Sequence, residues 1–266
     1  RSTNVAVVVP ATDAHAARGN ATAFFHRIVA TFSAVAARVA RERNAPLTFA
    51  MVFPFSNHNF DLRYWLAASG LHPDRDVRLV AIPPPLMVDS LRSGAVDGFC
   101  VGEPWNSVAV SQGLGEIVAT QSQLLPRSAE KVLALQARFA DRSPDVLERL
   151  LRALDAAAAW VDDEAHRAVL AECLARPEYL GVAPELIAAT LAGQLNLGAG
   201  RSLEDRDFLY FGRDGANVPD ASMGLWSYAQ MARWWQVFPS AQAARTAAGV
   251  FRADLYRQAL GRAPAA

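Results

Sequence analysis

Two loops of this sequence collect residues that could hold a small ligand, and hydrogen-bond donors dominate in both. His58 lies in "FPFSNHNF" beside Asn57, without an adjacent carboxylate. The stretch "VGEPWN" offers Gly102, whose bare backbone lets a ligand approach an amide, followed by Glu103 and Trp105. The first loop supplies donors or switchable donors, and the second an accessible amide. The sequence therefore favours the binding of a small anion.

Lys131 is the only lysine among the 26 basic residues of the chain. It lies in "LLPRSAEKVLALQARFADRSP", where the other basic residues are arginines. A composition so biased toward arginine makes any lysine rare. Chance and a role in ligand binding are therefore both open for this position.

Each of these residues also has a purely structural interpretation. A lone histidine such as His58 is often a capping or solvated residue, and Gly102 could serve only the turn. Arg63 could face solvent or clamp an anion. Cys100 has apolar neighbours that would raise the pKa of its thiol, which argues against a nucleophile and for a small buried hydrophobe.

The elements that must position these loops are strands alternating with helices. Ligands of parallel sheets bind beyond the carboxyl ends of the strands, where both loops fall. The spacing predicts a mainly parallel sheet that is buried on both faces. Strands are predicted at 46–54, 77–84, 98–104 and 116–121, and helices at 21–43, 59–70, 85–92 and 105–115.

The second half of the chain is predicted to be helical. Ser143 is expected to cap a helix that begins at Pro144 and runs through Trp160. Further helices are expected at 164–175 and 183–193. The aromatic stretch "LWSYAQMARWWQVFP" is apolar around nearly its whole circumference, so we expect that helix to be wedged between layers.

Composition excludes several classes of protein. The 266 residues are 52% hydrophobic and carry 26 acidic and 26 basic residues, which argues against a broad nucleic-acid or anionic-membrane surface. No run of 18 apolar residues exists, so no membrane span is expected. The two cysteines have no metal-site spacing, and neither a metal nor a cofactor is expected.

The chain begins without Met and directly in a loop that enters a strand, so we expect an incomplete N-terminus.

Several segments together resemble the family of nitrate, nitrite and bicarbonate binding proteins. They are "HN…LRYWLA", "PPP.M", "DGFCVGEPWN" and "EKVL", in the family's order and spacing. The resemblance implies an α/β fold of the type II periplasmic-binding-protein kind, with two lobes around a cleft. Residues 1–43 and 132–266 would form lobe 1, with part of that N-terminal lobe missing, and 44–131 would form lobe 2.

The resemblance also implies a ligand site. The family's ligand histidine aligns with His58, its glycine amide donor with Gly102 and its ligand lysine with Lys131. Bicarbonate has a hydroxyl that needs an acceptor. The resemblance implies that the bicarbonate-binding members of the family have a carboxylate at the position of Lys131. Lys131 therefore favours nitrate or nitrite. Supporting roles are expected for three neighbours, Asn57, Glu103 and Trp105.

A further donor is expected near the start of the chain. The family's side-chain amide donor corresponds to Asn4 in "STNVAVVV", although the surrounding pattern departs from that of the family. Thr3 or Ser2 could take its place.

Two functions of binding without catalysis are consistent with the resemblance. The first is a cytoplasmic sensor that binds nitrate or nitrite and controls an RNA-binding antiterminator of nitrate assimilation genes, favoured by "WSYAQMARWWQ" in the tail. The alternative is the substrate-binding component of a nitrate/nitrite ABC transporter, with an ABC permease as partner and a periplasmic or lipoprotein-anchored location. An enzyme of the thiamine-pyrimidine type shares the fold, but its cysteine-rich motif has no counterpart here.

Overall fold

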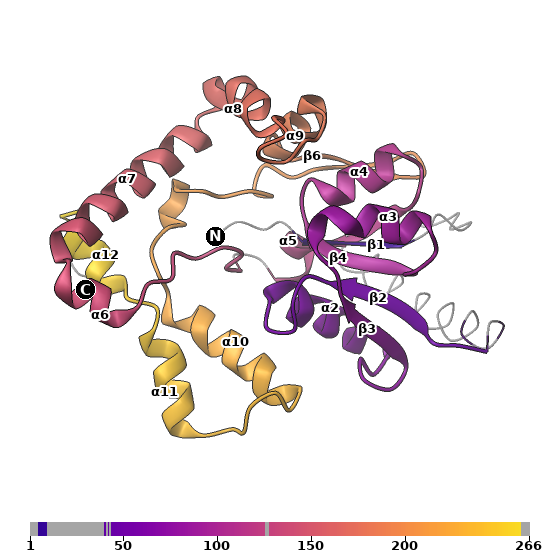
Figure 1. The fold of residues 1–266 in the computed structure, drawn as a ribbon, viewed down its shortest axis with the longest axis horizontal. Helices are drawn as coiled ribbons and strands as arrows, with labels where there is room; N and C mark the ends of the chain where they lie inside the picture. Colours follow the sequence, from indigo (N-terminus) through magenta and orange to yellow (C-terminus); the bar gives the residue numbers. More distant parts are fainter. Residues whose placement is uncertain (1–4, 10–39, 41, 43, 126–127, 262–266) are drawn as a thin grey trace. The chain divides into compact units, whose positions relative to one another are not determined.

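The computed structural model describes residues 5–9, 40, 42, 44–125 and 128–261 (Figure 1). They form two compact units. Within the described residues, unit 1 comprises 128–192 and 206–261, and unit 2 comprises 5–9, 40, 42, 44–125 and 193–205. Nearly all of the helix predicted at 21–43 lies outside the described residues, as does Asn4.

The two units divide the chain differently from the predicted lobes. Strand β1 (Val5–Val9), predicted with lobe 1, pairs with two strands of unit 2. Residues 193–205, also predicted with lobe 1, belong to unit 2. Boundaries drawn at 43 and 131 could not anticipate this, because both segments join unit 2 through contacts that are distant in sequence.

Unit 2 is built on a five-stranded sheet in the order β3, β2, β4, β1, β5. The strands after β1 are β2 (Leu47–Met51), β3 (Val77–Ala81), β4 (Gly98–Gly102) and β5 (Glu116–Thr120). The prediction of a mainly parallel sheet holds for β2 to β5, whereas β1 inserts antiparallel between β4 and β5, which the sequence did not predict. Strands β2 to β5 nevertheless share one direction, so their carboxyl ends lie at one edge.

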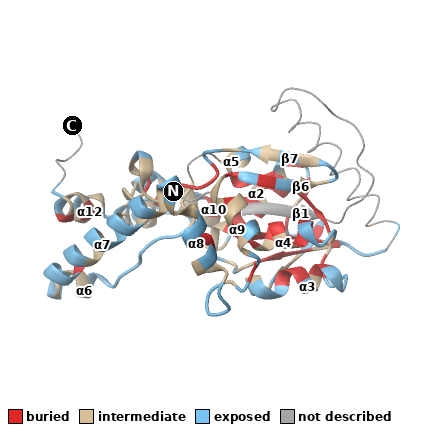
Figure 2. Ribbon diagram, turned by 90° about the horizontal axis from the view of Figure 1, so that it is seen from above, coloured by how far each residue is buried: buried red, intermediate tan, exposed pale blue. Residues whose placement is uncertain are grey.

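Helices cover both faces of this sheet, as the sequence predicted. Phe49 packs with residues of α2, whereas the next residue, Ala50, packs with residues of α3 and α4. Cys100 and Phe99 alternate in the same way on β4, as the period of a strand requires. Figure 2 shows the buried residues along these strands and their covering helices. The helical elements are α2 (Asn57–Ala68), η1 (Pro84–Leu86), α3 (Met87–Arg92), α4 (Trp105–Ser111) and α5 (Gln121–Leu124).

A β-hairpin that the sequence analysis missed completes unit 2. It consists of β6 (Gln194–Gly198) and β7 (Arg201–Glu204). Its turn has three successive residues with positive φ, 85° at Gly198, 48° at Ala199 and 71° at Gly200. Arg201 donates hydrogen bonds of 3.0 Å to the Glu116 carboxylate and 3.2 Å to the carbonyl of Ile117. The hairpin is thereby fixed to β5.

All regular secondary structure among the described residues of unit 1 is helical. Its elements are α6 (Ala137–Arg142), α7 (Pro144–Asp162), η2 (Glu164–His166), α8 (Arg167–Leu174), α9 (Pro184–Leu191), η3 (Arg213–Gly215), α10 (Ala221–Arg233), α11 (Ala241–Gly249) and α12 (Ala253–Ala259). The helices predicted from 144 to 193 are confirmed. Ser143 occupies the N-cap position of α7, but its side chain makes no capping hydrogen bond, contrary to the prediction.

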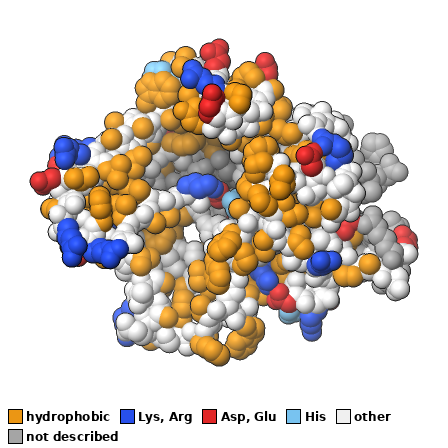
Figure 3. All heavy atoms as spheres, in the orientation of Figure 1, with side chains coloured by type: hydrophobic (Ala, Val, Ile, Leu, Met, Phe, Trp, Pro, Cys, Tyr) orange, Lys and Arg blue, Asp and Glu red, His pale blue; other side chains and the backbone are white. Residues whose placement is uncertain are grey.

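The aromatic tail is not wedged between layers, so that prediction is wrong. Helix α10 ends at Arg233, and Trp235 follows with a φ of 58°, which turns the chain away from the helix. Trp235 is 81% exposed and Phe238 is 88% exposed. Figure 3 shows hydrophobic side chains gathered where α10 gives way to α11. The predicted apolar circumference assumed one continuous helix.

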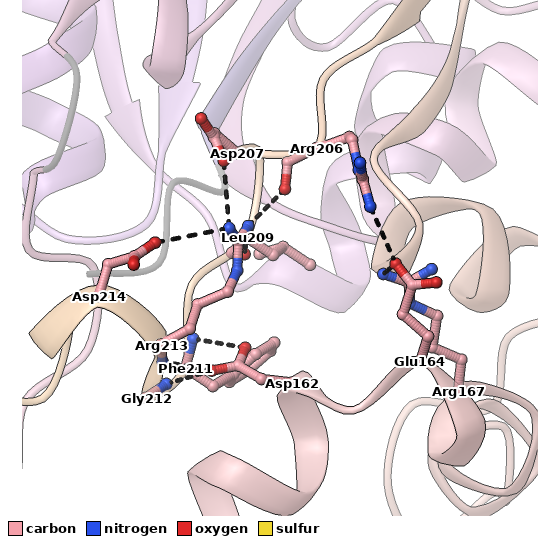
Figure 4. A network of polar contacts seen from close by, with 10 residues as sticks. All are labelled: Asp162, Glu164, Arg167, Arg206, Asp207, Leu209, Phe211, Gly212, Arg213 and Asp214. Carbon is pink, nitrogen blue, oxygen red and sulfur yellow. Dashed lines mark hydrogen bonds and ion pairs between the residues drawn. The ribbon is translucent and has the colours of Figure 1, made fainter.

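Asp162, the last residue of α7, anchors a distant loop (Figure 4). Its carboxylate accepts backbone hydrogen bonds from Phe211 at 3.1 Å, Gly212 at 2.6 Å and Arg213 at 2.6 Å. The Arg213 guanidinium in turn donates to Asp207 at 3.1 Å. These contacts join two segments about 50 residues apart in the sequence.

We expect Asp162→Ala to lower the free energy of unfolding by about 2 kcal/mol, because three partly buried N–H groups lose a charged acceptor. Urea denaturation measures this change. Asp163→Ala is the neighbouring control and should cost less, because the Asp163 carboxylate makes only local contacts among the described residues, as the cap of the short helix η2 and with His166 at 3.8 Å. Equal losses in the two variants would contradict the anchoring role.

Candidate functional site

The two donor-bearing loops of the sequence lie at neighbouring strand ends of unit 2. Strands β2 and β4 are adjacent and parallel, with Phe49 opposite Gly98. His58 is the second residue of α2, which follows β2, and Gly102 is the last residue of β4. The carboxyl ends of parallel strands are the usual place for ligands in such sheets. This edge is therefore the candidate site.

The loop before α2 is held by its own polar residues. Ser56 is the N-cap and accepts a hydrogen bond from the Asn59 amide at 3.3 Å. The Asn59 side chain donates to the carbonyl of Pro54 at 2.7 Å. Ser56 and Asn59 thus shape the loop, while His58 is buried and Asn57 half-buried at the start of the helix. The helix N-terminus adds a partial positive charge beside the imidazole, which suits an anion.

Arg63 has a structural role, in place of the two roles that the sequence left open. Its guanidinium donates at 3.1 Å to Asn59 and pairs with Asp74 at 2.7 Å. The hydrogen bond from Arg63 holds the pKa of the Asp74 carboxyl below its usual value. Arg63 thereby fixes the loop through Asn59.

The turn after β4 is organised around Gly102. The Asn106 side chain is fully buried and donates to the carbonyl of Val101 at 2.9 Å. The Glu103 carboxylate accepts a hydrogen bond from the Ser107 amide at 3.2 Å, in the first turn of α4. Trp105 packs against the hydrophobic core. These contacts fix the backbone on both sides of the Gly102 amide, and the supporting roles of Glu103 and Trp105 in ligand binding stay a prediction.

Burial raises the pKa of the Glu103 carboxyl from its ordinary value of 4.5, and hydrogen bonds from Ser107 and Asn106 oppose the shift more weakly. Between the ordinary and the raised pKa, the folded protein binds more protons than the unfolded chain. The stability contributed by Glu103 is therefore greatest below the ordinary pKa and falls as pH rises through the raised pKa. We expect Glu103→Gln to gain stability relative to the unsubstituted protein as pH rises above 4.5 and through the raised pKa of Glu103. Urea unfolding across this range measures the difference, and parallel stability curves would contradict the prediction.

The sequence did not predict one buried polar pair in unit 2. Asp61 of α2 accepts a hydrogen bond of 3.0 Å from the side chain of Gln121, and both residues are fully buried. The pair joins α2 to α5. Thr120 and Gln123 form a capping box that signals the start of α5, but no local pattern connects Gln121 with Asp61, which lies 60 residues earlier.

Lys131 lies in unit 1, in a segment without regular secondary structure. Its side chain is 77% exposed, and its ammonium pairs with the carboxylate of Glu130. His58 and Gly102 belong to unit 2. The structure therefore brings together the two loops of unit 2, whereas convergence of Lys131 with them stays a prediction. Asn4, the fourth predicted ligand residue, lies outside the described residues.

Other kinds of site have little support in the described part of the chain. No group of three or more His, Cys, Asp or Glu residues there could hold a metal ion. Cys100 is buried in the core and Cys173 is half-buried, and neither forms a disulfide. None of the described helices combines the length and the apolar character needed to cross a bilayer.

A cavity of about 380 Å³ in unit 1 is lined by the charged network of Asp162 and its neighbours (Figure 4). Arg167 and Arg206 both pair with Glu164, and Arg213 pairs with Asp207. Opposite charges that already pair with each other offer little to an anion. We therefore assign this cavity a structural role.

The sheet topology and the helices on both of its faces define the class of protein. The fold is that of the type II periplasmic solute-binding proteins. The solved periplasmic nitrate-binding protein of Synechocystis matches with a TM-score of 0.85 and 28% identity, over 98% of this chain and 65% of that one. The chain belongs to the NMT1-like family, whose model matches residues 5–175. Within it, the chain groups with the nitrate and bicarbonate solute-binding proteins, as the sequence motifs predicted.

Two relatives show how much of their length is shared. A nitrate/nitrite binding protein of Synechococcus elongatus is 36% identical over 214 residues, which are 80% of this chain and 48% of the relative. A nitrate import ATP-binding protein of Synechocystis is 38% identical over 213 residues, 79% of this chain and 32% of the relative. The chain thus spans half or less of these relatives.

The cytoplasmic location predicted from the sequence is wrong. The matched solved structure is that of a periplasmic nitrate-binding protein. The prediction relied on the likeness of the tail to sensor-type endings. The motif "WSYAQMARWWQ" runs past the end of α10 at Arg233 to the exposed Trp235. Nothing in this local structure is specific to a cellular location.

Proposed function

We propose that this chain binds nitrate or nitrite without chemical turnover and serves as the substrate-binding part of an ABC-type anion import system in the periplasm. The observation that carries the proposal is the adjacency of His58 and Gly102 at neighbouring strand ends of a solute-binding fold. The similarity to proteins named for nitrate binding and nitrate import supports the same ligand and the same process.

Donor chemistry supports nitrate as the ligand. Nitrate carries one negative charge over three acceptor oxygens and has no proton to donate, so its site needs donors only. An imidazole, a peptide N–H and the Lys131 ammonium are donors of three different shapes. Each charge-assisted hydrogen bond contributes roughly 1.5 to 3 kcal/mol. Four or five such bonds, less the cost of desolvation, give a binding free energy near −8 kcal/mol, which corresponds to a Kd in the micromolar range.

Bicarbonate is the competing ligand, because a bicarbonate-binding protein of Synechococcus elongatus is also a relative, at 33% identity. Its hydroxyl needs an acceptor, and an ammonium at position 131 offers none. We expect isothermal titration to give micromolar binding of nitrate and nitrite and at least tenfold weaker binding of bicarbonate. Tighter binding of bicarbonate than of nitrate would overturn the ligand assignment.

The import role needs its own experiment, since an antiterminator partner was also predicted from the sequence. The tagged protein is incubated with detergent-solubilised nitrate permease complex and, separately, with an RNA-binding antiterminator, each with and without nitrate. The proposal expects nitrate-dependent association with the permease. Nitrate-sensitive association with the antiterminator alone would refute the import role while leaving anion binding intact.

A further inference from the structure

Glu103 places a buried carboxyl group directly beside the amide of Gly102. It follows the last residue of β4 and precedes α4 (Figure 1). Its Oε2 atom accepts a hydrogen bond from the Ser107 amide at 3.2 Å. Its Oε1 atom is buried and accepts no hydrogen bond from the described residues. The carboxyl group is therefore removed from water while one of its two oxygens stays unsatisfied.

A second buried acceptor lies in the first turn of α4. The Asn106 side chain is fully buried, and its Nδ2 atom donates to the carbonyl of Val101 at 2.9 Å. This bond fixes the orientation of the amide, whose Oδ1 atom is buried without a hydrogen-bond partner in the described part of the chain. An ionised Glu103 can only accept hydrogen bonds, so it satisfies neither oxygen. A proton on Glu103 turns the carboxyl group into a donor and removes a buried charge.

No cation among the described residues forms an ion pair with Glu103. The elements packed against β4 and α4 are α2, α3 and the neighbouring strands. The arginines on or beside these elements each pair with another carboxylate, Arg63 with Asp74, Arg92 with Asp89 and Arg201 with Glu116. The other titratable groups on these elements are His58, Asp61 and Tyr64 of α2 and Cys100 of β4.

Burial is the largest cause that raises the pKa of the Glu103 carboxyl, and hydrogen bonds from Ser107 and Asn106 oppose it. An ionised Glu103 would put an uncompensated negative charge next to an amide that is proposed to bind an anion. Like charges at such short range repel, and burial strengthens the repulsion. The geometry of the turn is therefore suited to a neutral Glu103 when the anion is bound.

We propose that Glu103 takes up a proton together with the anion, so that this chain binds nitrate and a proton as a pair. The proposal rests on the proposed function, because it places the anion at the Gly102 amide. In this step one carboxylate, one proton from solvent and one nitrate give a carboxyl group and a bound nitrate. By linkage, the anion favours protonation of Glu103 as strongly as the proton favours binding of the anion. Glu103 thus sets the affinity through its charge.

Isothermal titration of the full 266-residue chain with sodium nitrate, at constant ionic strength over a series of pH values, tests this coupling. The unsubstituted protein should lose affinity as pH rises through the pKa of Glu103, because the carboxylate that forms repels the anion. Glu103→Gln has no charge at any pH. Above the pKa of Glu103, this variant should bind nitrate about tenfold or more tightly than the unsubstituted protein.

Asp89→Asn is the matched control, since it makes the same change from carboxylate to amide at an exposed position of α3. Its affinity should follow that of the unsubstituted protein at every pH. His58 also titrates, but its share of the pH dependence is present in all three proteins. The difference between the curves of Glu103→Gln and the unsubstituted protein therefore reports Glu103 alone.

Infrared difference spectroscopy gives a second measurement, on the unsubstituted protein. The C=O band of a protonated carboxyl group has no contribution from imidazole. Above the pKa of Glu103, we expect nitrate to increase this band in the unsubstituted protein and to leave it unchanged in Glu103→Gln. If Glu103→Gln does not fold, the band of the unsubstituted protein decides.

Two results would overturn the coupling and leave the proposed function intact. One is the same pH dependence of nitrate binding in Glu103→Gln and the unsubstituted protein, and the other is a carboxyl band that nitrate does not change. Absence of nitrate binding in both proteins at every pH would overturn the proposed function and the coupling together.

Discussion

Replacing Lys131 with alanine is expected to weaken nitrate binding at least tenfold in isothermal titration. The ammonium is the only cation among the proposed ligand groups, and hydrogen bonds to charged groups contribute more than neutral ones. Because the Lys131 side chain is exposed, its removal leaves no cavity in the fold, so a loss of binding would not come from a loss of stability. Lys131→Arg should recover only part of the affinity, since a planar guanidinium is bulkier than an ammonium that reaches one oxygen.

His58→Ala tests the other side of the same site and should also cost at least tenfold. The control for both ligand variants is Arg152→Ala, which removes an exposed cation of unit 1 that pairs with Glu148 of the same helix. It should bind nitrate like the unsubstituted protein. If Lys131→Ala behaves like this control, the lysine is a surface residue and its assignment as a ligand is lost.

The largest loss of stability is expected from Gly224→Ala. Gly224 lies inside α10 and is buried against α11. A Cβ atom there would come within 2.1 Å of the Ala247 carbonyl oxygen and 2.9 Å of the Phe251 ring. A clash with backbone cannot be relieved by a rotamer change, so the helices must separate. We expect a loss of about 3 kcal/mol or more in the free energy of unfolding by urea.

Gly249→Ala is the matched control on the partner helix. A Cβ atom at Gly249 meets nothing within 4 Å, and alanine restricts the unfolded chain. This variant should be neutral or more stable by up to about 1 kcal/mol. The opposite signs at the two glycines test the close packing of α10 on α11, and similar effects at both would contradict it.

Much of unit 2 could be predicted because its signals are local. Apolar runs ending at Pro54 or followed by polar loops predicted β2 to β5, and the stop at Gly70 predicted the end of α2. The direction of β1 could not be predicted, since no crossover helix of fixed hand constrains a strand that precedes the alternating pattern. The β6–β7 hairpin was missed because Leu195 and Leu203 give its short strands only a weak pattern.

For the site too, local sequence signals could be predicted and contacts between distant elements could not. His58 and Gly102 could be placed at one edge, because each follows a strand and neighbouring parallel strands end together. Asp61 and Gln121 could not be paired, since their contact depends on how α2 and α5 pack. The exposure of Trp235 was missed because one positive φ ends the helix, and helical periodicity alone does not reveal such a turn.

The most direct test of the central claim is a crystal structure of the protein with bound nitrate. The account predicts one anion at the carboxyl edge of the unit 2 sheet, within hydrogen-bonding distance of the His58 imidazole, the Gly102 amide and the Lys131 ammonium. An anion bound elsewhere, or bound at this edge while the Lys131 side chain points into solvent, would contradict it.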